Sequence, residues 1–149
     1  MLKARRKALK NLLQEKVVNI SDFRSLATGR AVRRIAIASA DKSLAEGLIS
    51  RLKGVAEVSA FESRFLLEQA LKSQEWDSVV LDERTLVDDT MALCEKIKRQ
   101  GKGDDVFVMI LSENSSKEVV RQGFEKGCDE WVTKLENIDH LARLLSQSL

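Results

Sequence analysis

Polar residues follow several short apolar runs in this chain, and their types are those that could do chemistry. Asp82 directly follows one such run, Ser112 follows another, and Lys134 comes after a third. A carboxylate can act as a nucleophile, a hydroxyl can donate a hydrogen bond to an anion, and an ammonium group supplies fixed positive charge. These groups can act on one ligand only if the fold brings them to the same place.

The elements that must position these residues are indicated by the apolar pattern from about position 33 onward. Five short runs predict strands, at 35–38, 55–58, 78–81, 106–111 and 131–133. Five intervening or following stretches have apolar residues at helical spacing, at 44–52, 65–71, 91–97, 119–124 and 138–145. Strands without polar alternation are buried on both faces. We therefore predict an α/β fold: a doubly wound, five-stranded parallel sheet with helices on both faces.

In such a sheet the functional crevice lies outside the carboxyl ends of the strands. The candidate residues are those directly after the strands, namely Ser39, Ala40, Asp41, Asp82, Glu83, Arg84, Ser112, Glu113 and Lys134. Apolar residues that define the second and fourth helices are Phe65, Leu66, Ala70, Leu71, Val119, Val120 and Phe124.

The first 30 residues differ from the rest in charge. Positions 1–34 hold ten Lys/Arg against two acids, a charge of +8, which leaves −6 of the total of +2 for positions 35–149. We predict a basic helical hairpin or linker at 1–30 and one domain at 31–149. A solvated helix face is the favoured interpretation of the basic segment, and a surface for nucleic acid or membrane lipid is the alternative.

Composition excludes several classes. With 44% apolar and 32% charged residues, the chain reads as soluble and globular, and no apolar run approaches the length of a membrane span. Cys94 and Cys128 fit free thiols in a reducing cytoplasm. His140 is the only histidine and there is no CxxC, so a zinc-type metal site is not expected. No nucleophile–base pair or cofactor motif is apparent, so we expect neither an enzyme nor a bound cofactor.

Three motifs carry a family resemblance. They are Asp77-Ser-Val-Val-Leu-Asp82, Phe107-Val-Met-Ile-Leu-Ser112 and Gly127-Cys-Asp-Glu-Trp-Val-Thr-Lys134. In this order, and separated by 30 and then 22 positions at their last residues, they resemble the receiver domain of bacterial response regulators, the CheY-like superfamily. The resemblance covers positions 33–149. It implies the strand order 2-1-3-4-5 and a place in two-component signalling or a phosphorelay.

The resemblance also implies roles for single residues. Asp82 stands at the phospho-acceptor position, Ser112 and Lys134 at the phosphate site, and Trp131 at the aromatic position that switches with Ser112. Lys134 is expected to form a salt bridge with Asp82. The alternatives are that Trp131 is a core or interface aromatic and that Ser112 satisfies a local backbone group. The fourth helix, fifth strand and last helix form the face that would meet a histidine kinase, an output protein or a second copy, through Lys117, Arg121, Trp131, His140 and Arg143.

The chain departs from the family pattern around this site. Ser39 and Ala40 replace the acidic pair that holds Mg²⁺, and only Asp41 or Glu113 could substitute. Leu135 stands in place of a cis-proline, so a trans bond and a rearranged loop are expected. Thr85-Leu86 replaces Met-Pro.

These departures predict a pseudo-receiver, which acts through protein contacts with little or no Mg²⁺-dependent phosphorylation and with Lys134 as the main cation near Asp82. Two alternatives remain. One is a working phospho-acceptor that uses Asp82 with an unusual metal site. The other is an adaptor whose basic N-terminal arm binds nucleic acid or membrane.

Overall fold

The structure is a computed structural model that describes residues 32–86, 89–100, 106–133 and 137–149. The predicted basic hairpin at 1–30 lies outside these residues, as do Lys134 and Leu135. The strands are β1 (Arg34–Ala38), β2 (Glu57–Phe61), β3 (Ser78–Asp82), β4 (Phe107–Leu111) and β5 (Glu130–Val132). They form one parallel sheet in the order β2-β1-β3-β4-β5, which confirms the predicted fold.

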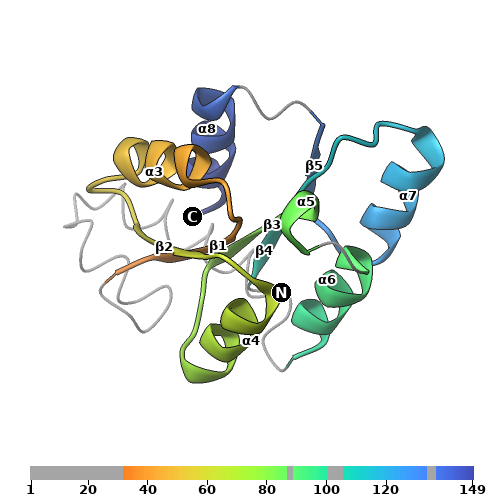
Figure 1. The fold of residues 1–149 in the computed structure, drawn as a ribbon, viewed down its shortest axis with the longest axis horizontal. Helices are drawn as coiled ribbons and strands as arrows, with labels where there is room; N and C mark the ends of the chain where they lie inside the picture. The colour runs from red at the N-terminus through yellow and green to blue at the C-terminus, as the bar shows by residue number, and fades with distance from the viewer. Residues whose placement is uncertain (1–31, 87–88, 101–105, 134–136) are drawn as a thin grey trace, which may run out of the picture.

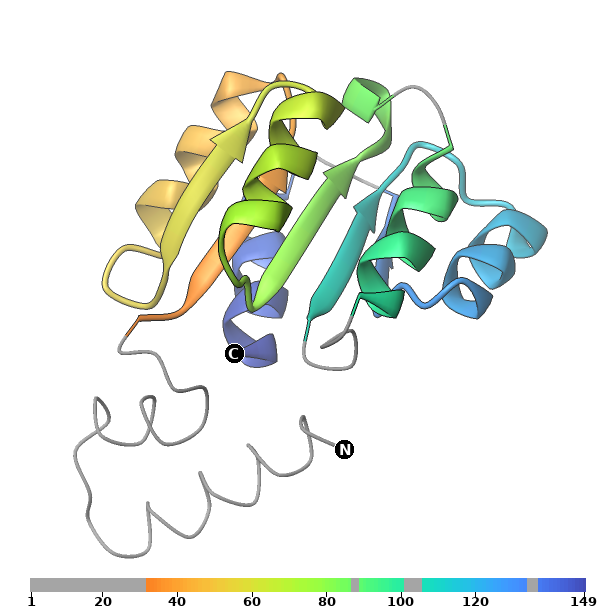
Figure 2. The same cartoon turned by 90° about the horizontal axis from the view of Figure 1, so that it is seen from below.

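Helices cover both faces of this sheet (Figure 1). On one face, α3 (Lys42–Arg51) and α8 (Ile138–Ser148) lie side by side. On the other lie α4 (Arg64–Ser73) and α6 (Thr90–Arg99), while α7 (Lys117–Glu125) lies next to β5. Figure 2 shows the strand arrows pointing the same way, with the short helix α5 (Glu83–Leu86) at their carboxyl ends. None of the helices in the described part of the chain is long and apolar enough to cross a membrane.

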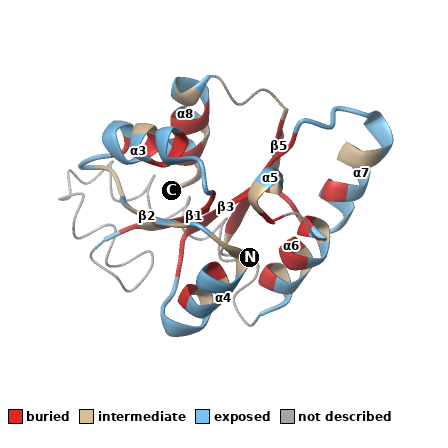
Figure 3. Cartoon of the chain, in the orientation of Figure 1, coloured by how far each residue is buried: buried red, intermediate tan, exposed pale blue. Residues whose placement is uncertain are grey.

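Alternate strand residues supply the two halves of the core, as expected for strands buried on both faces. Figure 3 shows the central strands as buried and the outer sides of the helices as exposed. The α4 and α6 side of the sheet receives Ala36, Ala38, Val79, Leu81, Val108 and Ile110. The α3 and α8 side receives Ile35, Ile37, Val80, Met109 and Leu111.

The second strand lies later in the chain than the apolar run 55–58 predicted. The backbone N–H groups of Val55 and Ala56 both donate to the carbonyl of Leu52, at 2.9 and 3.0 Å, which closes the end of α3. Gly54 makes this turn with a φ of 83°, a conformation that glycine adopts without steric cost. The strand therefore starts at Glu57, and its half-buried position at the edge of the sheet weakens the apolar signal.

The predicted apolar faces of two helices are partly wrong. In α4, Phe65 is 67% exposed and Leu66 47% exposed, whereas Leu67 is fully buried. Ser63 caps this helix by accepting the N–H of Leu66. The helix that starts from this cap has Leu67 and Ala70 on the side that faces the sheet. In α7, Phe124 is 47% exposed, because Gly123 faces the sheet instead.

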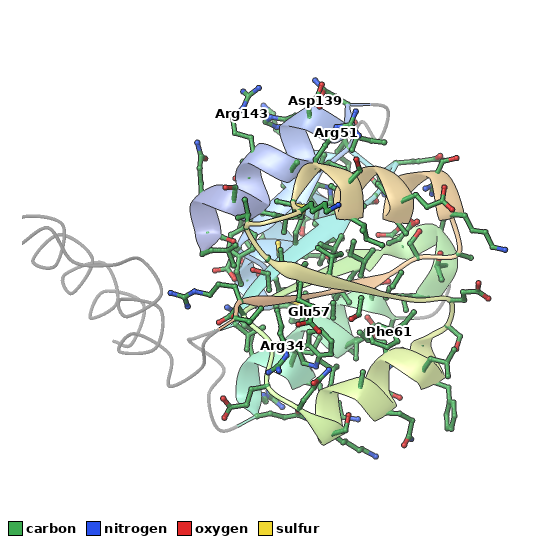
Figure 4. All side chains as sticks on the ribbon, turned by 90° about the vertical axis from the view of Figure 1, so that its left-hand side faces the viewer. Arg34, Arg51, Glu57, Phe61, Asp139 and Arg143 are labelled. Carbon is green, nitrogen blue, oxygen red and sulfur yellow. The ribbon has the colours of Figure 1, made fainter. Side chains whose placement is uncertain are left out.

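The amino ends of the strands are joined by a buried ion pair. Arg33 Nη1 lies 3.5 Å from Asp77 Oδ1, and both side chains are 3% exposed or less. The other oxygen of Asp77 accepts the backbone N–H of Arg34 at 2.8 Å. Figure 4 shows Arg34 beside Glu57, its partner in the β1–β2 register. Asp77 thus links the start of β3 to the start of β1.

An exposed ion pair joins α3 and α8 at the surface. Arg51 Nε donates to Asp139 Oδ1, and Figure 4 shows the two side chains meeting on the outer side of the helices. Their side chains are 41% and 73% exposed, so solvent screens this pair far more than the Arg33–Asp77 pair.

Cys94 and Cys128 are free thiols inside the core on the α4 and α6 side. Burial raises the pKa of Cys94 to about 11 and that of Cys128 to about 12. Both thiols therefore stay protonated at neutral pH, and the thiolate is the reactive form. We expect iodoacetamide at pH 8 to label neither cysteine of the folded protein and both in denaturant, as read by intact mass. Rapid labelling of the native protein would contradict the burial of these thiols.

Candidate functional site

The candidate site lies at the carboxyl ends of β1 and β3. The register pairs Ala38 with Leu81, so the next residues along the two strands, Ser39 and Asp82, are neighbours. The Ser39 hydroxyl donates to Asp82 Oδ2 at 2.7 Å. Ser39 is 2% exposed and Asp82 1% exposed, so a carboxylate is buried here against a hydroxyl. A buried carboxylate needs hydrogen bonds and a nearby positive charge to remain ionised at low cost.

Arg84 supplies that positive charge. Its Nε donates to Asp82 Oδ1 at 3.2 Å and its Nη2 to Asp82 Oδ2 at 3.1 Å, a two-pronged contact with the carboxylate. The backbone N–H of Arg84 also donates to Oδ1, at 3.1 Å. The contact forms because α5 begins directly after β3, which turns the chain so that residue 84 faces back toward residue 82. Arg84 itself is 42% exposed, at the mouth of the site.

The loop after β1 is tied to the same site. Asp41 Oδ1 accepts the N–H of Leu44 at 3.1 Å, which caps α3, while its Oδ2 lies 3.6 Å from Arg84 Nη2. The N–H of Asp41 donates to the Ser39 hydroxyl at 3.1 Å, so this hydroxyl accepts one hydrogen bond while it donates another. Ala40 N–H donates to the Thr85 hydroxyl at 2.8 Å, which connects the loop to α5.

The electrostatics at the site are those of one cation among several carboxylates. The hydrogen bond with Asp82 raises the pKa of the Arg84 guanidinium, and the negative charges of Asp82, Asp41 and Glu113 act in the same direction. Partial burial opposes this shift. Arg84 is therefore permanently charged, and Glu113, which is exposed one residue after Ser112, belongs to its surroundings.

Ser112 and Trp131 are connected through one loop residue. Ser112 is fully buried, and its hydroxyl accepts the N–H of Asn114 at 3.0 Å. The carbonyl of Asn114 in turn accepts the indole N–H of Trp131 at 3.0 Å. The Trp131 ring lies against Gly123 of α7, where an added Cβ would come within 2.6 Å of two ring carbons. Trp131 is thus half-buried, with its ring held between a helix and a loop.

The contact between Gly123 and Trp131 predicts that a larger side chain at position 123 destabilises the fold. Gly123→Ala is expected to lower the free energy of unfolding by about 1–2 kcal/mol, because the ring must move, although alanine favours the helix by about 1 kcal/mol. Urea unfolding, with tryptophan fluorescence to report the displaced ring, measures the effect. Gln122→Ala, at an exposed site on the same helix, is the control, and equal stability of the two variants would contradict the contact.

Comparison with solved structures returns response regulators. The receiver domain of DrrB in its BeF3-activated form matches at 26% identity with a TM-score of 0.66, covering 78% of this chain and 97% of that one. DrrB of Thermotoga maritima, an OmpR/PhoB homologue, matches at 28% identity with a TM-score of 0.66. The matched region covers 78% of this chain and 52% of that one, so the likeness spans about half of DrrB.

The chemotaxis protein CheY4 of Vibrio cholerae has the same fold, at 16% identity and a TM-score of 0.69, covering 79% of this chain and 99% of that one. Comparison with protein-family models and with curated proteins gives no match. The strand order and these structural neighbours show the fold of a response-regulator receiver domain in this chain, and its motifs are similar to those of that family.

The residues present do not fit the magnesium ion that the family resemblance implies. Mg²⁺ takes oxygen ligands in near-octahedral geometry, usually with one or two carboxylates. A carboxylate has about four lone-pair sites, and Asp82 already accepts from the Ser39 hydroxyl and from three groups of Arg84. Within the described ranges no three His, Cys, Asp or Glu side chains are grouped so as to hold a metal. Asp41, Glu113 and Asp82 do not form such a group among the described residues.

Sequence reasoning named most of the residues at this site but missed the role of Arg84. The structure brings Ser39, Asp82 and Arg84 together, and it places Asp41 next to Arg84. The available signal was an arginine two positions after Asp82, directly beyond the end of the predicted strand 78–81. The expectation that Lys134 would be the main cation near Asp82 did not allow for Arg84, whose guanidinium contacts Asp82 directly.

Proposed function

We propose that this chain is a pseudo-receiver, a signalling module that acts through protein contacts with little or no Mg²⁺-dependent phosphorylation of Asp82. The observation that carries the proposal is that hydrogen bonds from the same chain already fill the Asp82 carboxylate. An incoming phosphoryl group needs a free carboxylate oxygen as nucleophile and positive charge aimed at its own oxygens. Here the positive charge of Arg84 is directed at the nucleophile itself.

Trp131 has a partner within the chain that is consistent with this proposal. The Ser112 hydroxyl accepts the N–H of Asn114, and the Asn114 carbonyl accepts the indole N–H of Trp131. The indole is therefore held without a phosphoryl group, while the Ser112 hydroxyl keeps its own proton as a hydrogen-bond donor.

We assign partner contacts to the face formed by α7, β5 and α8. Lys117, Arg121, His140 and Arg143 are exposed on it, and Trp131 is half-buried. Phe124 adds an exposed apolar side chain on α7. Arg121 is paired with Glu118 and Glu125 of its own helix, so this face carries both positive and negative charges. Its partner would be a histidine kinase, an output protein or a second copy, in the cytoplasm, where the buried free thiols would stay reduced.

Beryllofluoride, a noncovalent mimic of a phosphoryl group, tests this proposal. Addition of beryllofluoride and Mg²⁺ is expected to leave the amide NMR spectrum around Asp82, Ser112 and Trp131 unchanged. The DrrB receiver domain, which has been described in a BeF3-activated form, is the positive control. Saturable shifts at these residues would instead favour a working phospho-acceptor.

Deletion of positions 1–30 distinguishes the adaptor alternative from a receiver that binds its partner through the α7, β5 and α8 face. If this segment binds nucleic acid or membrane, the deletion should remove binding that is strongly salt-dependent. If the receiver face makes the contact, partner binding should survive the deletion and weaken in Arg143→Ala.

A further inference from the structure

We infer that Arg84 takes the place of the metal ion at this site, as a built-in cation that joins Asp82 to the loop after β1. The inference rests on the proposed function and deepens it, since it names the residue that keeps a divalent cation away from Asp82. It follows from the mismatch between the residues present and a magnesium site.

The first step is the position of the guanidinium. Arg84 Nη2 lies between two carboxylates, 3.1 Å from Asp82 Oδ2 and 3.6 Å from Asp41 Oδ2. One of these acids ends β3 and the other follows β1, so a single positive group bridges two neighbouring strands. A divalent cation bound at the carboxyl ends of these strands would make the same bridge.

The second step is that the position is held from several sides. The Arg84 backbone N–H is fixed on Asp82 Oδ1, and α5 is fixed to the loop by the hydrogen bond between Ala40 and Thr85. Ser39 donates to the same oxygen of Asp82 that Arg84 Nη2 contacts. The guanidinium therefore contacts Asp82 from a backbone position that is itself bonded to the same carboxylate.

The third step concerns charge. The acids that act on Arg84 are Asp82, Asp41 and Glu113, and Arg84 offsets one of their negative charges. The net attraction for Mg²⁺ is reduced, and the lone pairs of Asp82 are occupied. Removal of the guanidinium would leave the Oδ2 atom of Asp41 and the Asp82 carboxylate without this cation, although Asp82 keeps its bonds from Ser39 and from the backbone of residue 84. Two carboxylates with the help of water are a set that Mg²⁺ can bind weakly.

The test is thermal unfolding of the full chain with and without MgCl₂, against NaCl of equal ionic strength. Arg84→Met removes the charge and keeps much of the side-chain length. Arg99→Met is the matched control, because Arg99 is 76% exposed on α6 and its loss changes the net charge equally. We expect the wild type and Arg99→Met to show no Mg²⁺-specific change in Tm. Arg84→Met should gain several degrees, and Asp82→Asn added to Arg84→Met should abolish the gain.

Two results would overturn the inference. One is an equal Mg²⁺ response in the wild type and in Arg84→Met, and the other is an Arg84→Met response no larger than that of Arg99→Met. If Arg84→Met does not fold, Arg84→Gln replaces it with the same expectations. Failure of this inference is distinguishable from failure of the proposed function, because a beryllofluoride response of the wild type would sink that function whatever Mg²⁺ does to the Arg84 variants.

Discussion

Ser39→Asp is expected to lower the free energy of unfolding by about 3 kcal/mol at neutral pH, because it places a second buried carboxylate beside Asp82. The Ser39 hydroxyl lies 2.7 Å from Asp82 Oδ2, and both residues are almost fully buried. A hydrogen bond is thereby replaced by repulsion between like charges. Arg84 already bonds both oxygens of Asp82 and can offset only part of this repulsion.

Urea unfolding of the wild type, Ser39→Asp and Ser39→Asn at pH 8 and pH 5 measures this effect. Ser39→Asn has the size of aspartate without its charge, so the difference between the two variants isolates the charge. Protonation of the introduced carboxyl removes the repulsion, so the folded variant binds this proton more tightly than the unfolded chain does. Stability should therefore return as the pH falls. Equal stability of the two variants at pH 8 would contradict the buried, charged Asp82.

Asp77→Ala is expected to cost about 3–5 kcal/mol, because it leaves the buried charge of Arg33 without this carboxylate. The Arg33–Asp77 pair lies at the amino ends of the strands, where both side chains are 3% exposed or less. The substitution also removes the acceptor for the backbone N–H of Arg34.

The Arg51–Asp139 pair supplies a matched comparison for that measurement. Because its two side chains are largely exposed, Asp139→Ala should cost less than about 1 kcal/mol. Chemical denaturation of both variants gives the two values directly. If Asp77→Ala were no more destabilising than Asp139→Ala, burial would not be what makes the Arg33 pair important.

Much of the fold could be predicted from the sequence because the central strands are buried on both faces. The runs that contain Ile35, Val80 and Ile110 lack polar alternation, which is the direct consequence of helices on both sides. The edge strand β2 was placed too early, because Val55 and Ala56 are apolar yet belong to the turn that ends α3. At a half-buried edge, hydrophobicity does not distinguish a strand from a turn.

Helix faces were harder to predict than strands because the phase of a helix depends on where its cap lies. Phe65 and Leu66 appeared to belong to the core by spacing, but the Ser63 cap directs Leu67 and Ala70 inward. In α7 the inward residue is Gly123, which contributes no apolar signal, and the contact partner that explains it is Trp131. The local spacing of apolar residues does not predict such contacts between different elements.

The sequence predicted which residues lie at the site, but not the hydrogen bonds and ion pairs that join them. The motifs and the strand ends pointed to Asp82, Ser112 and Ser39. That Arg84 would turn back onto Asp82 depends on α5, a one-turn helix too short to leave a periodic pattern. The roles of Asp82, Ser112, Trp131 and Lys134 in signalling stay predictions, and Lys134 lies outside the residues that the structure describes.

The most direct measurement for the central claim is the intact mass of the wild-type chain after incubation with acetyl phosphate and Mg²⁺. Asp82→Asn serves as the control for labelling at other residues. We expect no phosphoryl adduct on the wild type beyond that of Asp82→Asn, because Ser39 and Arg84 occupy the carboxylate. A stable adduct that is lost in Asp82→Asn would contradict the account and establish Asp82 as a working phospho-acceptor.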